Sequence, residues 1–173
     1  MQILRILFLN LMLSMYVATP LSAQIPNMRI PLTTEVAKVI KSKEPGWKYI
    51  TGVCHCPRIT SGEVVLDIGK WERKIKGGRL ETIRMRIHKI ASTEEAAQWM
   101  DQWNREIAIG WPQVKRYDLA DEAYLLDHRF GVNSVNPITI FFRKKNIIVE
   151  VSGDSLGVVE RFARYSVKAL PVN

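Results

Sequence analysis

Apolar residues recur at helical spacing in three segments of the chain, which predicts three helices. The predicted helices span about residues 33–43, 93–109 and 156–170. Thr33 or Thr34 is the expected N-cap of the first helix, because a hydroxyl there accepts a hydrogen bond from the first turn. Ser92 and Glu95 form a capping box at the start of the second, since each side chain can bond the other residue's backbone N–H.

Shorter apolar runs, bounded by glycine and proline, predict strands. The predicted strands span about residues 47–56, 62–76, 79–90, 123–128, 137–143 and 147–152. Gly77-Gly78 separates the second strand from the third and favours a two-residue hairpin loop, which pairs Lys76 with Arg79. A two-residue loop near Lys145 places these residues on one buried face: Ile138, Ile140, Phe142, Ile147, Val149 and Val151.

This order of elements predicts an α+β fold. Hairpins dominate the strand pairings, so we expect a largely antiparallel sheet of about six strands, two hairpins among them. About three helices should pack against this sheet and cover at least one of its faces.

The first 23 residues have the order of regions that is typical of a secretory signal peptide. Arg5 supplies a positive start, residues 6–18 are apolar with two exceptions, and Ala23 ends a stretch of small residues. The apolar run is shorter than the about 20 residues that a membrane span needs. We expect cleavage after Ala23, which leaves 150 of the 173 residues as a single domain, residues 24–173.

The residue after the expected cleavage site is Gln24, and not the cysteine that lipid attachment requires in bacteria. We therefore expect an exported chain, periplasmic or secreted, that is soluble after cleavage at Ala23 and is not lipid-anchored. The mature part should contain no stable membrane span, and export argues against nucleic acid as the partner.

The positive charge of the mature chain is concentrated in one predicted hairpin. Without Arg5, 24 of the 25 Lys and Arg residues remain against 17 Asp and Glu, a net charge of +7. Residues 70–89 hold eight basic residues against Glu72 and Glu81, and so contribute +6. A local basic patch indicates an anionic partner. The alternative is a solvated hairpin that only keeps the protein soluble.

With a two-residue loop at Gly77-Gly78, one face of this hairpin combines basic, polar and aromatic side chains. Trp71 then lies opposite Arg84. An aromatic ring among guanidinium groups can stack on a ligand while the arginines bind its phosphate or carboxylate. The candidate binding residues are Asp67, Trp71, Arg73, Arg84, Arg86 and His88. The alternative is a cross-strand cation–π contact without a ligand, and a helix over this face would make Trp71 a core residue.

Cys54-His55-Cys56 is the candidate thiol or metal site. On a strand, Cys54 and Cys56 point to one face and His55 to the other. The two thiols could close a strained disulfide, bind a soft metal such as Cu(I), or have no role beyond structure. A tetrahedral zinc site needs two further ligands, and nothing in the sequence brings His88 or His128 to Cys54. We expect no other cofactor.

Two clusters could serve a small hydrolase. In the two-residue register Asp67 lies opposite His88, and a carboxylate that orients an imidazole is the arrangement a general base needs. Neither residue faces a Ser, Thr or Cys nucleophile in that register. Glu122, Asp127 and His128 form the second cluster.

The sequence thus favours a non-enzymatic exported module that binds a partner through the basic face at residues 70–89. The expected partner is an anionic ligand, a polysaccharide, a lipid head group or an acidic protein. The alternatives are a thiol, disulfide or soft-metal protein centred on Cys54 and Cys56, and a small hydrolase that uses Asp67 and His88.

Overall fold

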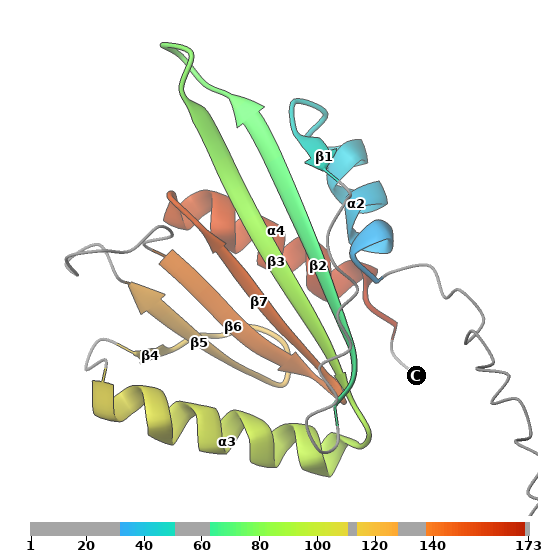
Figure 1. Cartoon of the computed structure of the whole chain (residues 1–173), viewed down its shortest axis with the longest axis vertical. Helices are drawn as coiled ribbons and strands as arrows, with labels where there is room; N and C mark the ends of the chain where they lie inside the picture. Colours follow the sequence, from blue (N-terminus) through green and yellow to red (C-terminus); the bar gives the residue numbers. More distant parts are fainter. Residues whose placement is uncertain (1–31, 51–62, 111–113, 128–137, 172–173) are drawn as a thin grey trace, which may run out of the picture.

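A computed structural model describes residues 32–50, 63–110, 114–127 and 138–171 (Figure 1). In chain order its elements are α2 (Leu32–Lys43), β1 (Lys48–Ile50), β2 (Glu63–Lys74), β3 (Leu80–Ile90), α3 (Thr93–Gly110), β4 (Lys115–Arg116), β5 (Glu122–Asp127), β6 (Ile138–Lys144), β7 (Ile147–Gly153) and α4 (Leu156–Ala169). The strands form one antiparallel sheet in the order β1-β2-β3-β7-β6-β5-β4. The predicted α+β class is confirmed, with one strand more than predicted, the short β4.

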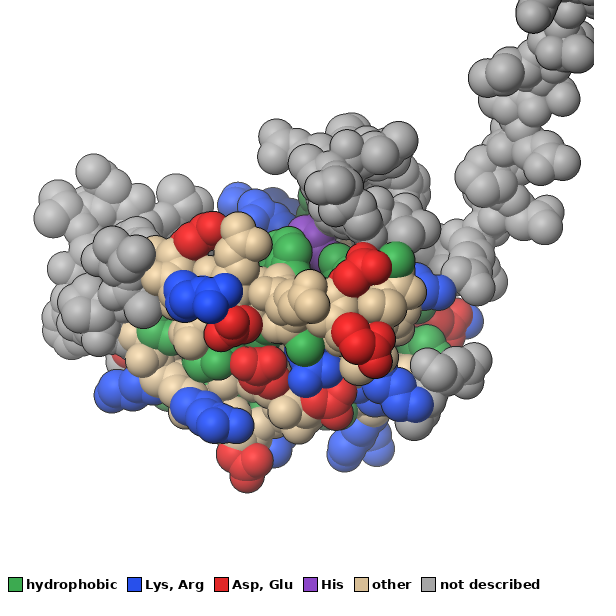
Figure 2. All heavy atoms as spheres, turned by 90° about the horizontal axis from the view of Figure 1, so that it is seen from below, with side chains coloured by type: hydrophobic (Ala, Val, Ile, Leu, Met, Phe, Trp, Pro, Cys, Tyr) green, Lys and Arg blue, Asp and Glu red, His purple; other side chains and the backbone are tan. Residues whose placement is uncertain are grey.

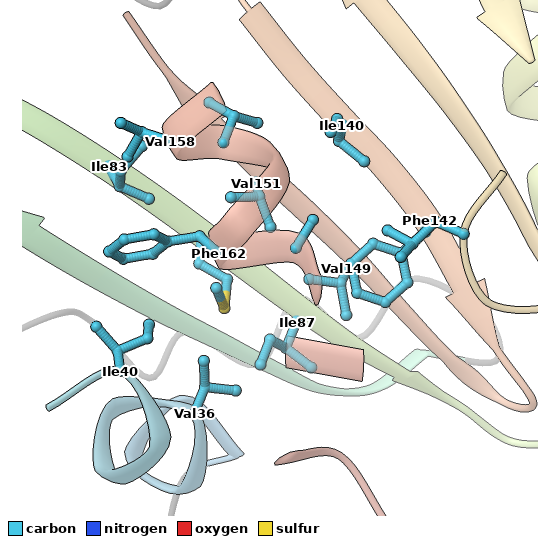
Figure 3. Close-up of a cluster of buried hydrophobic side chains, with 14 of the residues drawn as sticks. Val36, Ile40, Ile83, Ile87, Ile140, Phe142, Val149, Val151, Val158 and Phe162 are labelled. Atoms are coloured by element: carbon cyan, nitrogen blue, oxygen red, sulfur yellow. The ribbon is translucent and has the colours of Figure 1, made fainter. Parts of the chain in front are cut away.

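Helices cover both faces of the sheet (Figure 1). The α2/α4 face is the side on which α2 and α4 pack and where the larger core lies, and the α3 face is the opposite side. Figure 3 shows the larger core, in which Val36 of α2 and Phe162 of α4 lie with Val149 of β7. Removal of this apolar surface from water is the main force that holds the layers together.

The central hairpin, β6 and β7, is buried on both of its faces. Phe142 and Val149 belong to the larger core, whereas Phe141 and Ile148 belong to a smaller cluster under α3. Two-sided burial explains why β6 and β7 are nearly continuous apolar runs instead of alternating ones.

Helix α3 attaches to the sheet through aromatic packing. The Trp103 ring stacks on Phe141 with centroids 3.9 Å apart, and Trp99 lies 5.5 Å from the same ring. At the start of α3, the Glu95 backbone N–H donates to Ser92 Oγ at 3.0 Å, so this half of the predicted capping box is confirmed.

The β6–β7 loop has the predicted length. Lys144 pairs with Ile147, which leaves Lys145 and Asn146 as a two-residue loop. Lys145 has a φ of +54°, a left-handed conformation that such a tight turn demands. The six apolar residues predicted to share one face of this hairpin all belong to the larger core.

The β2–β3 loop is longer than predicted, and the predicted register is wrong by one residue. The Ile75 backbone N–H donates to the Arg79 carbonyl at 2.9 Å, which leaves a three-residue loop, Lys76-Gly77-Gly78. Gly77 and Gly78 both have positive φ, at 86° and 78°, as their lack of a Cβ allows. A one-residue change of register moves side chains to the opposite face.

The first helix begins one residue earlier than expected, at Leu32, so the capping role given to Thr33 or Thr34 is wrong. Thr33 is buried, and its hydroxyl oxygen accepts a hydrogen bond from Tyr49 Oη at 3.0 Å. The next predicted strand, residues 47–56, is observed as Lys48–Ile50, and its remaining residues lie outside the described part. The predicted signal peptide, residues 1–23, also lies outside the described residues.

Candidate functional site

The predicted binding residues are divided between the two faces of the sheet. Trp71 pairs with Ile83 and not with Arg84, and both Trp71 and Ile83 belong to the larger core. Arg84 pairs with Lys70 instead, on the α3 face. The expected constellation of Trp71 with Arg84 and Arg86 is therefore wrong, because three residues in the loop reverse the faces that two would have given.

Trp71 is a core residue. This is the outcome expected if helices cover the face of the sheet on which Trp71 lies. Its side chain is 1% exposed, and its ring lies 4.8 Å from Tyr49 and 5.7 Å from Phe162. Gly69 makes room for this ring, since a Cβ at that position would lie 2.7 Å from the indole. The indole Nε1 is buried without a hydrogen-bond partner among the described residues. Trp71 is not available to stack on a ligand.

Arg73 is held in an ion-pair cluster on the α2/α4 face. Its Nε donates to Glu81 Oε2 at 2.7 Å, its guanidinium lies 4.6 Å from the Trp47 ring, and Glu44 is 3.9 Å away. The predicted cross-strand cation–π contact with Trp71 is therefore wrong, and the aromatic partner of Arg73 is Trp47. Glu81 is only 7% exposed, so the pair neutralises a buried carboxylate and belongs to the architecture.

Glu44, which the sequence did not single out, is the centre of that cluster. Its carboxylate accepts hydrogen bonds from Trp47 Nε1 at 3.0 Å, Arg161 Nε at 2.6 Å and Tyr165 Oη at 3.2 Å. Burial alone raises the pKa of Glu44, but these hydrogen bonds and the charge of Arg161 outweigh it and lower the pKa. The cluster joins the end of α2, helix α4 and the root of the β2–β3 hairpin.

Two basic residues on the α3 face also have acidic partners. Arg86 forms an exposed ion pair with Glu150 of β7 at 3.1 Å, and Lys70 pairs with Glu72 at 2.5 Å. Such exposed pairs contribute about 0 to 1 kcal/mol each. The acidic partners nevertheless cancel the positive charges of Arg86 and Lys70, which belong to the predicted basic patch at residues 70–89.

Four basic residues of the hairpin, three of them near its tip and one opposite Lys70, have no acidic partner among the described residues. These exposed residues are Lys74, Lys76, Arg79 and Arg84. Residues 74–80 contain no acid. The uncompensated charge therefore lies toward the tip of the hairpin.

The tip belongs to a two-stranded ribbon that extends past its neighbours (Figure 1). The last partners of the hairpin are Lys48 of β1, opposite Glu72, and Gly153 of β7, opposite Ile83. Residues 73–82 therefore lie beyond both neighbouring strands, and we call them the distal ribbon. At about 3.4 Å per residue, the distal ribbon reaches about 15 Å past the sheet.

The charge pattern differs at the other end of the molecule. Figure 2 views the molecule from the end at which α3 lies, and shows acidic and basic side chains interspersed there. On α3 itself, Arg105 pairs with Asp101 at 3.1 Å. The distal ribbon differs from this surface because its end, residues 74–80, carries basic side chains and no acidic ones, and Glu81 at its base is paired with Arg73.

Asp67 and His88 are not opposite each other in the observed register. Asp67 pairs with Ile87, and the residue opposite His88 is Leu66. His88 is half-buried on the α3 face, with its ring 5.8 Å from Trp99. The hypothesis of a hydrolase built on Asp67 and His88 loses the cross-strand opposition on which it rested.

The acidic stretch near β5 has structural partners. Asp121 accepts a hydrogen bond from the Lys145 backbone N–H at 2.6 Å, and Glu122 accepts one from Tyr124 Oη at 2.8 Å. Burial, with the hydrogen bond and charge of Glu122, raises the pKa of Tyr124 to about 12. Arg143 Nε is buried 3.5 Å from Glu122 Oε2, close enough for an ion pair but without a well-aligned hydrogen bond.

A surface hollow of about 380 Å³ adjoins this stretch and is lined by residues 116–123. Its lining includes Asp118, Asp121 and Glu122 but no histidine, serine, threonine or cysteine. His128, the third member of the predicted cluster, lies outside the described residues, so the hydrolase arrangement there stays a prediction.

Cys54, His55 and Cys56 also lie outside the described residues, and the thiol or metal hypothesis stays a prediction. Within the described ranges, no group of three or more His, Cys, Asp or Glu side chains is arranged to hold a metal ion. No helix in the same ranges is long and apolar enough to cross a membrane. Comparison of the chain with protein-family models, curated proteins and solved structures finds no match.

Proposed function

We propose that this chain is an exported, non-enzymatic module that binds an anionic partner through the distal part of its β2–β3 hairpin. One observation carries the proposal: Lys70, Arg73 and Arg86 have acidic partners, whereas the exposed residues Lys74, Lys76, Arg79 and Arg84 have none among the described residues. Unpaired charges of one sign on a projecting element attract an oppositely charged partner.

The proposed partner is anionic, as the sequence predicts, but the proposed contact surface is the distal part of the hairpin and not the whole face at residues 70–89. Of the predicted binding residues, Arg84 remains a candidate as an exposed cation beside the distal ribbon, and Arg86 contributes only if a ligand competes with its ion pair to Glu150. Trp71 and Arg73 are no longer candidates, because Trp71 is a core residue and Arg73 is paired with Glu81. Export is supported by the arrangement of residues 1–23.

Retention on immobilised dextran sulfate, a sulfated polysaccharide, tests the proposal. The variant Lys76→Glu/Arg79→Glu should elute at much lower salt than the wild type. A matched control, Lys115→Glu/Arg116→Glu, makes the same change of net charge in β4, at the opposite edge of the sheet, where both residues are exposed. The control should elute near the wild type. Equal loss of retention in both variants would contradict the proposal, because net charge alone would then explain binding.

A further inference from the structure

The tip of the distal ribbon combines its positive charge with an exposed leucine. Leu80 is 51% exposed and is the exposed large hydrophobic residue of the described part. It lies directly opposite Lys74 in the last pair of strands β2 and β3, next to Arg79 in sequence. A lone exposed leucine needs no explanation, because single apolar side chains are common on soluble proteins. The position of Leu80, at the end of a projecting basic element, is what carries the inference.

We infer that the anionic partner is the surface of a membrane that contains anionic phospholipid, with the Leu80 side chain buried among the head groups. The inference rests on the proposed function and names the partner class of the same site. Binding at a membrane interface combines buried apolar area with attraction between basic residues and anionic lipids. A hydrated sulfated or carboxylated polysaccharide offers nothing to an aliphatic side chain, whereas the acyl boundary of a lipid bilayer does.

The geometry of the tip suits a shallow approach. Its loop is Lys76-Gly77-Gly78, in which neither glycine has a side chain to hinder contact with a flat surface. Lys74 and Leu80 lie on one side of the ribbon and Arg79 on the other, so cations flank the leucine. No other described strand pairs with residues 73–82, so no neighbouring strand lies alongside the tip as it approaches.

Ion pairs attach the base of the distal ribbon to the rest of the domain and so hold its tip in one orientation. An isolated two-stranded hairpin is marginally stable in water. Here Arg73 and Glu81 face each other at the base of the ribbon, and their cluster extends through Glu44 to Arg161 of α4. The ion-pair cluster therefore has a positioning role: it fixes the direction in which the tip leaves the domain.

Vesicle co-sedimentation separates a membrane from other anionic partners. The chain is recovered from an exporting host, and its intact mass is checked, so that all variants have the same N-terminus. The probes are vesicles of phosphatidylcholine alone and of phosphatidylcholine with phosphatidylglycerol. Wild type should bind only the second. Neutralisation in Lys76→Gln/Arg79→Gln should weaken that binding about 30-fold.

Substitution of the leucine tests the apolar part of the inference. Leu80→Ser should weaken binding to the anionic vesicles about fivefold. The separate variant Leu80→Met should bind them as the wild type does, because methionine is apolar like leucine. Neither change alters charge, so retention on dextran sulfate should stay at the wild-type level. Leu80 is exposed, so both variants should fold, and a circular dichroism spectrum checks this.

The outcomes distinguish the two proposals. If wild type is retained on dextran sulfate through its tip but does not sediment with anionic vesicles, or if Leu80→Ser binds them as wild type does, the membrane inference is overturned. The proposed function then stands, with a polysaccharide or an acidic protein as the partner. If reversal of the tip charges leaves retention on dextran sulfate unchanged, the proposed function itself fails.

Discussion

The two long hairpins of the sheet differ in strand chemistry and in environment. The β6–β7 hairpin lies between two helical layers and buries both faces, while β3 alternates between buried and exposed positions along most of its length. The β6–β7 hairpin contributes side chains to the hydrophobic clusters on both faces of the sheet. The β2–β3 hairpin shares the core at its root and leaves it at its tip, where its charge is uncompensated. The contrast separates residues that hold the fold from residues that are free to bind.

The largest effect should come from side chains that both hairpins bury. Phe142→Ala in β6 and Trp71→Ala in β2 should each lower the free energy of unfolding by about 3–5 kcal/mol, as for large aromatic side chains removed from a core. Urea denaturation measures the loss. Trp71→Phe is the matched control and should cost much less, because it keeps an aromatic ring in place and removes the unpaired indole N–H. If Trp71→Ala lowers the free energy of unfolding by less than about 1 kcal/mol, Trp71 is a surface residue, which would contradict the observed register.

A smaller effect should come from the lysine that closes the buried hairpin. Lys144 Nζ donates to the carbonyl oxygens of Val167 and Leu170, both at 2.7 Å, at the C-terminal end of α4. A cation there satisfies free carbonyls and interacts favourably with the helix dipole. Lys144→Met should therefore lower the free energy of unfolding by about 1–2 kcal/mol. Lys115→Met, at an exposed position in β4, is the control and should change it little; equal losses in the two variants would remove the capping role.

The ion-pair cluster at the root of the ribbon predicts a pH effect. The pKa of Glu44 is lower in the folded chain than its ordinary value, so its contribution to stability is present above the unfolded pKa, about 4.3. That contribution is lost as pH falls through the folded pKa. Glu44→Gln should therefore be less stable than wild type at pH 7 by about 1 kcal/mol, and the difference should shrink below about pH 4.

Denaturation curves at several pH values measure this difference. Glu35→Gln, at an exposed ion pair with Lys38 in the same helix, is the matched control. A gap between wild type and Glu44→Gln that is constant from neutral to acid pH would show that the charge of Glu44 does not stabilise the cluster.

The smallest effect on stability should come from the tip. Lys76→Glu, Arg79→Glu and Leu80→Ser remove exposed side chains without core contacts, and each should change the free energy of unfolding by no more than about 0.5 kcal/mol. Thermal melts check this. A large loss from any of them would show that the tip helps to hold the fold, and the contrast between the hairpins would weaken.

The same contrast explains what the sequence could predict. The pairing of β6 with β7 was predictable because a two-residue loop at Lys145-Asn146 agrees with apolar positions on both strands. For β2 and β3, Gly77-Gly78 marks the turn but does not say whether Lys76 belongs to the loop. The sequence of β2 has apolar residues at both even and odd positions, Ile68 and Trp71 among them, so the hydrophobic pattern alone could not decide the register.

Prediction of the binding residues required the correct register of β2 and β3. Charge composition predicts a basic patch in residues 70–89, but the basic residues without acidic partners could not be identified until the partner of each one was known. Glu44 shows why: its partner Arg161 is 117 positions away in the chain. No local pattern joins those two residues, and only the packing of α4 against α2 brings them together.

The most direct test of the central claim is the retention of Lys76→Glu/Arg79→Glu and of Lys115→Glu/Arg116→Glu on dextran sulfate at rising salt. At about 0.05 M salt the tip variant should be lost from the matrix while the β4 variant is retained, and the difference should vanish near 1 M, where the Debye length is about 3 Å. Identical elution of the two variants, or a difference that persists at high salt, would contradict binding through the unpaired charges of the distal ribbon.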